Sequence, residues 1–337
     1  MNPPALADEL PAGHRPTETA SPAKPGPAPG ARSPRRGRGR DRWIGVIFIT
    51  PALILFVGLV LGPIGIAAYT SLFKWNGYVT APMQYVGLGN FTRLFQDQIF
   101  IGDLKRGFIL IVLSLVVQLP AALGLAMLLN QPLKGRTFYR LLFFAPYVLS
   151  EVTTGVLFLL VFSPNRGMAK EVFGWVGLED LAVNWLSDQR IVLYSVFVVI
   201  SWKYFGFHMI LYLAGRQNIP KELTEAATVD GASPWQVFRS VTLPLLGPTI
   251  RISIFLSVIG AIQLFDMVWV LTRGGPAHAS EVMAVTLFEY GFRRFEVGYA
   301  TAISIVMFLI CLVFALLYQR YVLRRDIEGA ITVMGRK

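Results

Sequence analysis

Long apolar runs separated by polar segments make up most of the chain. A helix needs about 20 mostly apolar residues to cross the hydrocarbon core of a bilayer. Three runs of that kind contain no charged residue and cover residues 43–73, 107–133 and 297–319. Three more contain isolated ionisable side chains and cover residues 141–165, 191–215 and 252–272. The pattern predicts an all-α integral membrane protein with six transmembrane helices.

The composition argues against a soluble globular protein. Apolar residues make up 54% of the sequence and charged residues 15%, whereas soluble domains average about 25% charged residues. The formal net charge of +11 suggests nucleic-acid binding as an alternative. However, much of the excess lies directly before the first apolar run, as arginines at positions 32, 35, 36, 38, 40 and 42. A basic cluster in that place is typical of a cytoplasmic anchor beside anionic lipid headgroups, and no base-reading motif accompanies it.

Basic residues also assign sides to the loops. An even number of spans places both termini on one side, and Lys and Arg favour the cytoplasmic side. They are more numerous on the side that carries the termini, although without the N-terminal segment the two sides are nearly equal. We therefore expect both termini in the cytoplasm. Residues 1–42 are expected to form a disordered basic tail, residues 43–325 the membrane domain, and residues 326–337 a cytoplasmic C-terminal tail.

The loops on the opposite side are expected to be partly ordered. Residues 83–100 place apolar side chains among polar ones, which predicts a short interfacial helix. Residues 171–186 are too apolar for a free loop. We expect them to pack on the helix ends or against a partner.

Residues able to perform catalysis or bind a metal are sparse. The single cysteine, Cys311, lies in an apolar run, and the three histidines are scattered without metal-ligand neighbours. The sequence contains no G-x-x-x-x-G-K-[ST] phosphate loop and no hydrolase or metalloprotease motif. We expect no metal, no cofactor and no enzymatic activity, so any ATP hydrolysis belongs to a separate polypeptide.

The segment between the fourth and fifth spans, residues 216–248, has the signals of two helices joined by a sharp turn. Pro220 suits a helix start, and Gly231 supplies a left-handed cap. Ser233, followed by Pro234 and Gln236, has the N-cap and capping-box pattern of a second helix. We expect Pro244 to end that helix before the membrane.

This loop contains small residues on one side, Ala226 and Ala227, and aromatic residues on the other, Trp235 and Phe238. Small side chains allow another surface to approach closely, which favours docking of a partner. An amphipathic element lying on the membrane surface fits the same spacing. The residues alone leave both interpretations open.

The loop also resembles the signature loop of permeases in binding-protein-dependent ABC importers. That signature is Glu-Ala-Ala, then Gly after three residues, then Leu-Pro; here it is Glu225-Ala226-Ala227, Gly231 and Leu243-Pro244. In that family the loop is a coupling helix that sits in a groove of the ATPase subunit. The resemblance implies that this contact is made here by Glu225, Ala226, Ala227, Asp230 and Gly231.

Further matches are similar to the carbohydrate branch of the family, which includes maltose and glycerol-phosphate importers. They cover residues 85–91, 271–276 and 298–300. The resemblance implies import of a sugar or oligosaccharide through a bacterial cytoplasmic (inner) membrane, with glycerol phosphate or another small polar solute as the alternative. It also implies as partners a second related permease, an ATP-binding subunit dimer and an extracytoplasmic binding protein. A secondary transporter is a remaining possibility, but the sequence shows no internal repeat.

Polar side chains inside the spans are candidates for the substrate path. Gln263 and Asp266 lie three residues apart, with Trp269 one turn further; Tyr204 and His208 share a face of the fourth span. Aromatic rings that stack on a sugar, with amide and carboxylate groups for its hydroxyls, make a plausible site. Helix packing is the alternative role for each residue. In that case Lys203 is expected to pair with Glu151 or Asp266.

Overall fold

The computed structural model describes residues 38–164, 167–175, 177 and 184–323. The chain forms two units, with the boundary between Phe56 and Val57. The described part of the first unit is helix α1, Arg38–Phe56. The boundary expected at residue 42 lies inside this helix, while residues 1–37 and the expected C-terminal tail lie outside the described residues.

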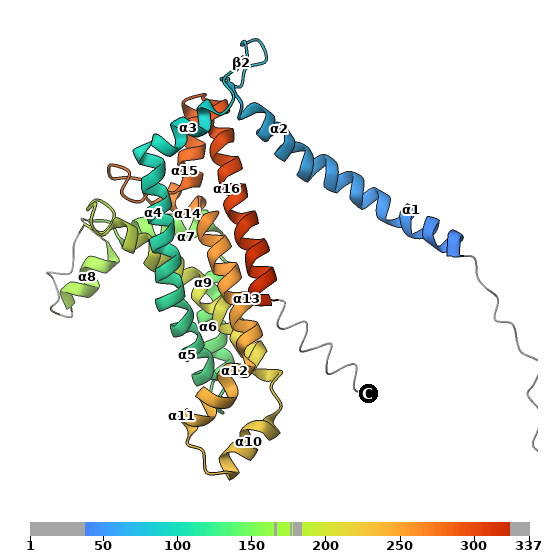
Figure 1. Cartoon of the computed structure of the whole chain (residues 1–337). Coiled ribbons are helices and arrows are strands. Elements are labelled where there is room, and N and C mark those ends of the chain that lie inside the picture. Colours follow the sequence, from blue (N-terminus) through green and yellow to red (C-terminus); the bar gives the residue numbers. More distant parts are fainter. Residues whose placement is uncertain (1–37, 165–166, 176, 178–183, 324–337) are drawn as a thin grey trace, which may run out of the picture. The chain divides into compact units, whose positions relative to one another are not determined.

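The described part of the second unit is helical apart from one small hairpin (Figure 1). Five of its described turns (η) have π-helical hydrogen bonding. The elements are η1 Val57–Leu61, α2 Gly62–Thr70, β1 Phe73–Lys74, β2 Gln84–Tyr85, α3 Gly89–Gln96, α4 Gln98–Leu113, η2 Ser114–Gln118, α5 Leu119–Leu129, α6 Arg136–Val148, α7 Glu151–Val161, α8 Met168–Trp175, α9 Val192–Gln217, α10 Lys221–Val229, α11 Pro234–Val237, η4 Phe238–Thr242, α12 Leu243–Leu245, α13 Gly247–Ile262, α14 Asp266–Leu271, α15 Met283–Phe288, η5 Glu289–Arg293, α16 Val297–Tyr318 and η6 Gln319–Leu323.

The predicted all-α membrane architecture is confirmed. Among the described residues, four helical runs are long and apolar enough to cross a bilayer: Val46–Thr70, Gln98–Leu129, Val192–Gln217 and Val297–Val322. Two bent pairs also qualify if each pair counts as one span, Arg136–Val148 with Glu151–Val161 at 101° and Pro234–Leu245 with Gly247–Ile262 at 66°. The count is therefore four to six, and the six spans and their sidedness stay predictions.

Two of the expected spans are interrupted rather than continuous. Helix α6 ends at Val148, Leu149 and Ser150 have extended backbone, and the Ser150 hydroxyl caps α7 by accepting from the Thr153 N–H at 3.1 Å. Helix α13 ends at Ile262, and α14 begins at Asp266. Serine at an N-cap competes with continued helix, so the first interruption has a local cause in the sequence.

Helix α9 packs against several neighbours in the second unit. Ala122 and Ala126 of α5 are fully buried in a cluster with Met209 and Leu213 of α9. At Gly206 the approach is closer still, because a Cβ built there would lie 1.9 Å from the carbonyl oxygen of Phe143 on α6. Small residues bring these helices together in the way typical of membrane bundles.

The segments at one end of the second unit are tied to the helices. The expected interfacial helix within 83–100 is present as α3, but its Leu94 is fully buried in a core cluster. Asn90 donates to the carbonyls of Ser71 and Phe73 at 2.8 and 3.0 Å. Helix α3 therefore packs on the bundle.

The described part of the other expected ordered loop also packs. The rings of Phe162 and Phe173 stack on Trp185 at 5.6 and 5.8 Å between centroids. Residues 176 and 178–183 of this loop lie outside the described residues.

Candidate functional site

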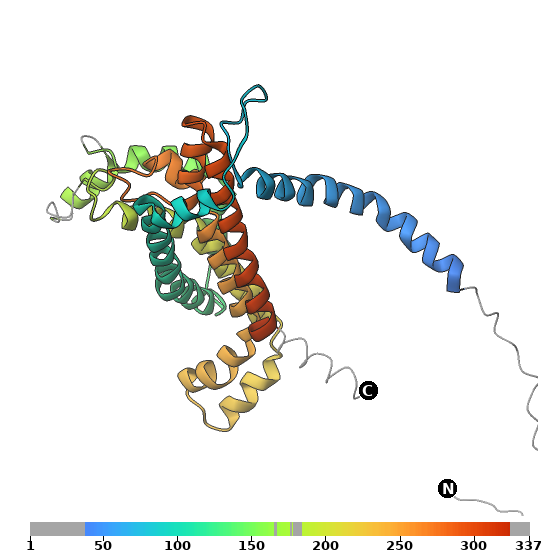
Figure 2. The same cartoon turned by 45° about the horizontal axis from the view of Figure 1, so that its top comes forward.

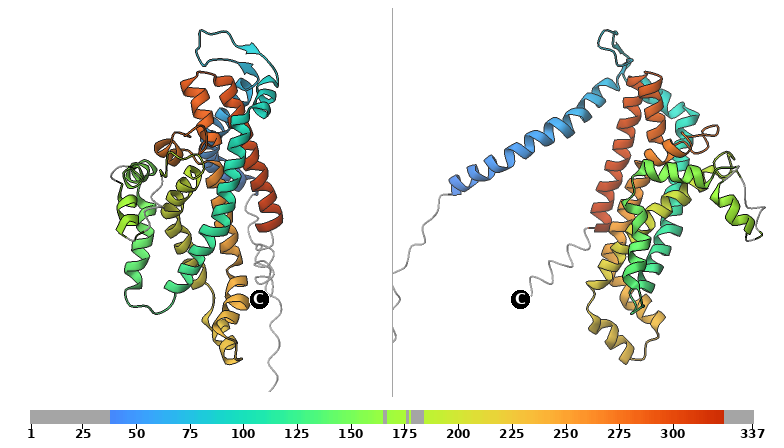
Figure 3. Two further views of the ribbon diagram at one scale, coloured as in Figure 1. Left: turned by 90° about the vertical axis from the view of Figure 1, so that its left-hand side faces the viewer. Right: turned by 180° about the vertical axis from the view of Figure 1, so that it is seen from behind.

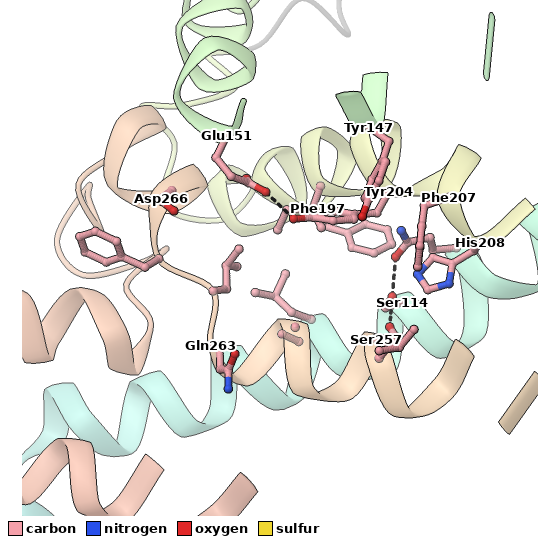
Figure 4. A pocket seen from close by; sticks show the side chains of 18 residues that line it. Ser114, Tyr147, Glu151, Phe197, Tyr204, Phe207, His208, Ser257, Gln263 and Asp266 are labelled. Atoms are coloured by element: carbon pink, nitrogen blue, oxygen red, sulfur yellow. Dashed lines mark hydrogen bonds between the residues drawn. The ribbon is translucent and has the colours of Figure 1, made fainter. Parts of the chain in front are cut away.

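A cavity of about 400 Å³ lies within the second unit. Its walls come from the end of α4 and η2, from α6, α7, α9 and α13, and from the linker before α14 (Figure 4). The volume is in the range typical of small-molecule sites. Among the described residues, no group of three or more His, Cys, Asp or Glu is placed to hold a metal ion.

Four of the five expected path residues line this cavity: Tyr204, His208, Gln263 and Asp266. Trp269 does not line it. The Trp269 ring instead stacks on Phe265 at 5.9 Å and meets Phe288 edge-on at 4.7 Å.

Both interrupted spans border the cavity. Tyr147 and Glu151 flank the first interruption, and Gln263 and Asp266 flank the second. Glu151 and Asp266 each stand in the first turn of a helix. The two interruptions therefore each bring one carboxyl side chain to the cavity.

The polar contacts at the first interruption differ from the expected ion pair. Lys203 of α9 donates to the carbonyl oxygen of Leu149. Tyr204 donates to the Glu151 carboxylate (Figure 4). The carbonyl of Leu149 lies at the end of α6, where helix carbonyls lose their intrahelical donors and attract cations. Lys203 therefore caps the end of α6 instead of forming the expected ion pair with Glu151 or Asp266.

The face of α9 that carries Tyr204 and His208 contributes both to the cavity and to helix packing. His208 Nδ1 lies 2.7 Å from the Ser253 hydroxyl, and the Tyr212 hydroxyl donates to the same oxygen at 2.9 Å. Tyr212 is buried and does not line the cavity. This part of α9 is held against α13.

The sequence analysis did not predict a group of hydrogen-bonded polar side chains on another wall of the cavity, formed by Ser114, Gln118 and Ser257. The Ser114 hydroxyl lies 2.7 Å from that of Ser257, 143 positions along the chain, and also contacts the amide oxygen of Gln118. Gln118 is 3% exposed, and its Nε2 has no partner within the described structure. The sequence did contain a signal for this group, because Ser114 and Gln118 lie four residues apart, on one helix face, within an apolar run.

Aromatic rings form the adjoining wall. The ring of Tyr147 stacks on Phe207 at 4.9 Å and meets Tyr204 at 5.9 Å. Rings and hydrogen-bonding groups thus face one space, as expected for a site that takes polar molecules with apolar faces.

The loop between α9 and α13 has the geometry expected from its sequence. Gly231 has φ +84°, its N–H donates to Thr228, and the Ala232 N–H donates to Ala227 at 3.0 Å. This pair of bonds is a Schellman motif. Ser233 and Gln236 then form the expected capping box at the start of α11.

The end of the loop differs from expectation. Pro244 does not end the second helix, because α11, η4 and α12 continue helically to Leu245, and the chain bends before α13. The helix therefore ends one residue beyond Pro244, and the chain bends by 66° before α13.

The loop projects from the second unit at the end opposite α3 and α15 (Figures 2 and 3). Val229 is 86% and Trp235 65% exposed, while Glu225, Ala226 and Asp230 are exposed and Ala227 is half-buried. The Trp235 and Phe238 rings lie 5.4 Å apart. The expected contact residues are therefore accessible on a capped, projecting element.

Residues 118–326, which include this loop and most of the cavity wall, match the family model described as "Binding-protein-dependent transport system inner membrane component". The chain belongs to this family. It is 33% identical over 81% of its length to a probable ABC transporter permease of Pyrococcus horikoshii, of which it covers 93%. It is 32% identical to the diacetylchitobiose uptake permease NgcF of Streptomyces coelicolor, over 89% of this chain and 88% of NgcF.

A solved structure has the same fold. The bacterial alginate ABC transporter, determined in complex with an alginate pentasaccharide-bound periplasmic protein, contains a chain that superposes with a TM-score of 0.73 at 26% identity. The match covers 83% of this chain and 94% of that one. The expected resemblance to importer permeases is confirmed, and the chain is a multi-pass membrane permease of this family.

Proposed function

We propose that this chain is the permease subunit of an ATP-driven, binding-protein-dependent sugar importer in a bacterial inner membrane. It forms half of the translocation pathway, and a second related permease supplies the other half. Energy comes from a separate pair of ATP-binding subunits, and cargo from an extracytoplasmic binding protein. The alginate transporter, which was solved with a periplasmic protein bound, supports the last of these partners.

The observation that carries the energy-coupling step is the projecting loop. Its turn is fixed by Gly231 and its second helix by the Ser233–Gln236 capping box. Val229 and Trp235 leave much of their apolar surface uncovered, which is typical of a surface that another protein covers. The loop contacts the ATPase through Glu225, Ala226, Ala227, Asp230 and Gly231.

The charge of the first loop helix argues against the membrane surface. Helix α10 carries Glu222 and Glu225 against a single Lys221, and Asp230 follows it, while Arg216 and Arg239 make the whole segment 216–248 neutral. Amphipathic helices that lie on bilayers carry an excess of Lys and Arg to attract anionic headgroups. The loop has no such excess, which favours docking of a protein partner.

The cavity supports a sugar as cargo. Tyr147, Tyr204 and Phe207 offer ring faces, and Gln263 with the two carboxylates offers hydrogen-bonding groups. NgcF, with which this chain shares 32% identity, belongs to a diacetylchitobiose uptake system. We assign Tyr204, His208, Gln263 and Asp266 to the substrate path, and we assign Trp269 to packing.

The test is replacement of an exposed loop residue that the fold does not need. Val229→Asp places a charge at a site that is 86% exposed, so the chain should insert normally. We expect loss of ATPase co-purification and loss of uptake. Val79→Asp is the matched control, because Val79 is 98% exposed on the hairpin at the other end of the second unit, and it should retain the ATPase.

Two results would argue against the proposal. Normal ATPase co-purification and uptake in Val229→Asp would remove the loop from energy coupling. Uptake by the chain without any ATPase subunit would favour a secondary transporter, a class in which broken helices at the binding site are common.

A further inference from the structure

We propose that this half of the pathway selects cargo by charge: it accepts uncharged and positively charged sugars and disfavours acidic ones. The inference rests on the proposed function, because it takes the cavity as part of the sugar path. The fold alone does not determine whether the cargo is neutral or charged. The alginate transporter, with the same fold, is involved in the import of an acidic polysaccharide.

The charges that face the cavity are of one sign. Glu151 and Asp266 both line it, and among its described lining residues there is no Lys or Arg. The two carboxylates come from different interrupted spans, and each lies in the first turn of a helix. A charge inside a membrane span is costly unless it serves a partner or an aqueous path.

The Lys203 and His208 side chains beside the cavity make contacts within the helix packing. Lys203 is 3% exposed and donates to the Leu149 carbonyl at the end of α6. It does not line the cavity. His208 lines the cavity, but its Nδ1 contacts the Ser253 hydroxyl within the α9–α13 packing. Neither group is placed to receive an anionic cargo.

A second observation indicates a polar ligand. Gln118 lines the cavity, is 97% buried and keeps an amide N–H without a partner in the described structure. A buried donor of this kind is costly unless a ligand or water accepts from it. Hydroxyl and amine groups of a sugar can donate to the carboxylates of Glu151 and Asp266, and a hydroxyl oxygen can accept from Gln118.

An acidic sugar meets the opposite situation. Its carboxylate cannot donate to Glu151 or Asp266, and it is repelled by both at an effective dielectric constant of roughly 20–30. For one carboxylate about 7 Å away, the repulsion corresponds to roughly a tenfold to hundredfold loss of affinity. An amino sugar gains a comparable attraction.

The experiment uses the assembled transporter, both permeases with the ATPase, in nanodiscs without binding protein. Three disaccharides of similar size serve as probes: neutral cellobiose, acidic cellobiouronic acid and the cationic glucosamine dimer. Their dissociation constants are compared by saturation-transfer NMR. We expect the acidic probe to bind at least tenfold more weakly than the neutral one, and the cationic probe to bind at least as well as the neutral one.

A charge-neutral variant tests the residues. In Glu151→Gln combined with Asp266→Asn, the gap between neutral and acidic probes should fall below about threefold. Glu171→Gln removes one charge from exposed surface on α8, outside the cavity, and should leave the gap unchanged. Because the wild-type comparison needs no variant, a folding defect cannot obscure the answer.

The failures are distinguishable. Equal binding of neutral and acidic probes to the wild type, or an unchanged gap in the double variant, overturns charge selection and leaves the importer function intact. Absence of binding by every probe, together with absence of sugar uptake when binding protein is added, overturns both the sugar cargo and the charge selection.

Discussion

Gly231 offers the sharpest test of the coupling loop, because substitutions there can distinguish backbone strain within this chain from steric contact with a docked partner. Its φ of +84° lies in the left-handed region. A Cβ added there meets no atom of this chain within 4 Å. A side chain at this position therefore strains the backbone, whereas its Cβ lies in open space. We consider three replacements: Gly231→Asn, Gly231→Ala and Gly231→Leu.

The backbone cost of a side chain in this conformation is about 1–2 kcal/mol for Ala or Leu, and less for Asn, which tolerates it. A cost of about 1.4 kcal/mol lowers the population of the turned loop about tenfold relative to other conformations. If this chain were the only constraint, Ala and Leu would behave alike. If the ATPase covers the turn, Leu should be much worse than Ala, because its side chain then meets the partner.

The assay measures co-purification of the ATPase and uptake of labelled sugar at matched amounts of inserted permease. We expect Asn to be closest to wild type, Ala to be weakened about tenfold or less, and Leu to lose both activities. Equal behaviour of Ala and Leu would show that the partner does not approach Gly231. Normal assembly and transport in Gly231→Leu would refute the assignment of this loop to coupling.

Three further outcomes follow from contacts in the second unit. Gly206→Ala should destabilise the bundle by about 1–3 kcal/mol or more, because the added methyl group overpacks against the Phe143 carbonyl, and should lower the melting temperature of the purified chain. Gly107→Ala is the control, because its added methyl group meets open space and should not lower the melting temperature. Equal melting temperatures of the two variants would contradict the close approach at Gly206. Lys203→Met should cost about 1.5–3 kcal/mol, because the Leu149 carbonyl loses a charged donor, and an unchanged melting temperature would argue against the cap. The purified chain alone should not hydrolyse ATP, and turnover in a preparation free of other ATPases would contradict the assignment to a transport subunit.

The features that sequence reasoning predicted well depend on neighbours along the chain. The capping box of Ser233 and Gln236 and the left-handed Gly231 follow from local backbone chemistry, so a short stretch of sequence is sufficient. The long apolar runs are also local, and four of them appear as uninterrupted helical runs.

The features that it missed depend on contacts between distant segments. The approach of Ser114 to Ser257 joins residues 143 positions apart, and no periodicity encodes that pairing. The interruptions at 149–150 and 263–265 lie inside runs that are apolar on both sides. Hydropathy is almost the same for a straight span and a broken one, so the local signals were Ser150 and, one turn before it, Pro146.

One physical account connects the ionisable residues that interrupt the apolar runs. Backbone groups freed by a helix break need partners where lipid supplies none. At the first break, Lys203 donates to the Leu149 carbonyl, and the Ser150 hydroxyl caps the next helix. Glu151 and Asp266 occupy the two new helix starts, where negative charge is stabilised. Because these polar ends cannot face hydrocarbon, they must face a shared interior space, and the cavity between them is therefore a consequence of the breaks that the charged residues make possible.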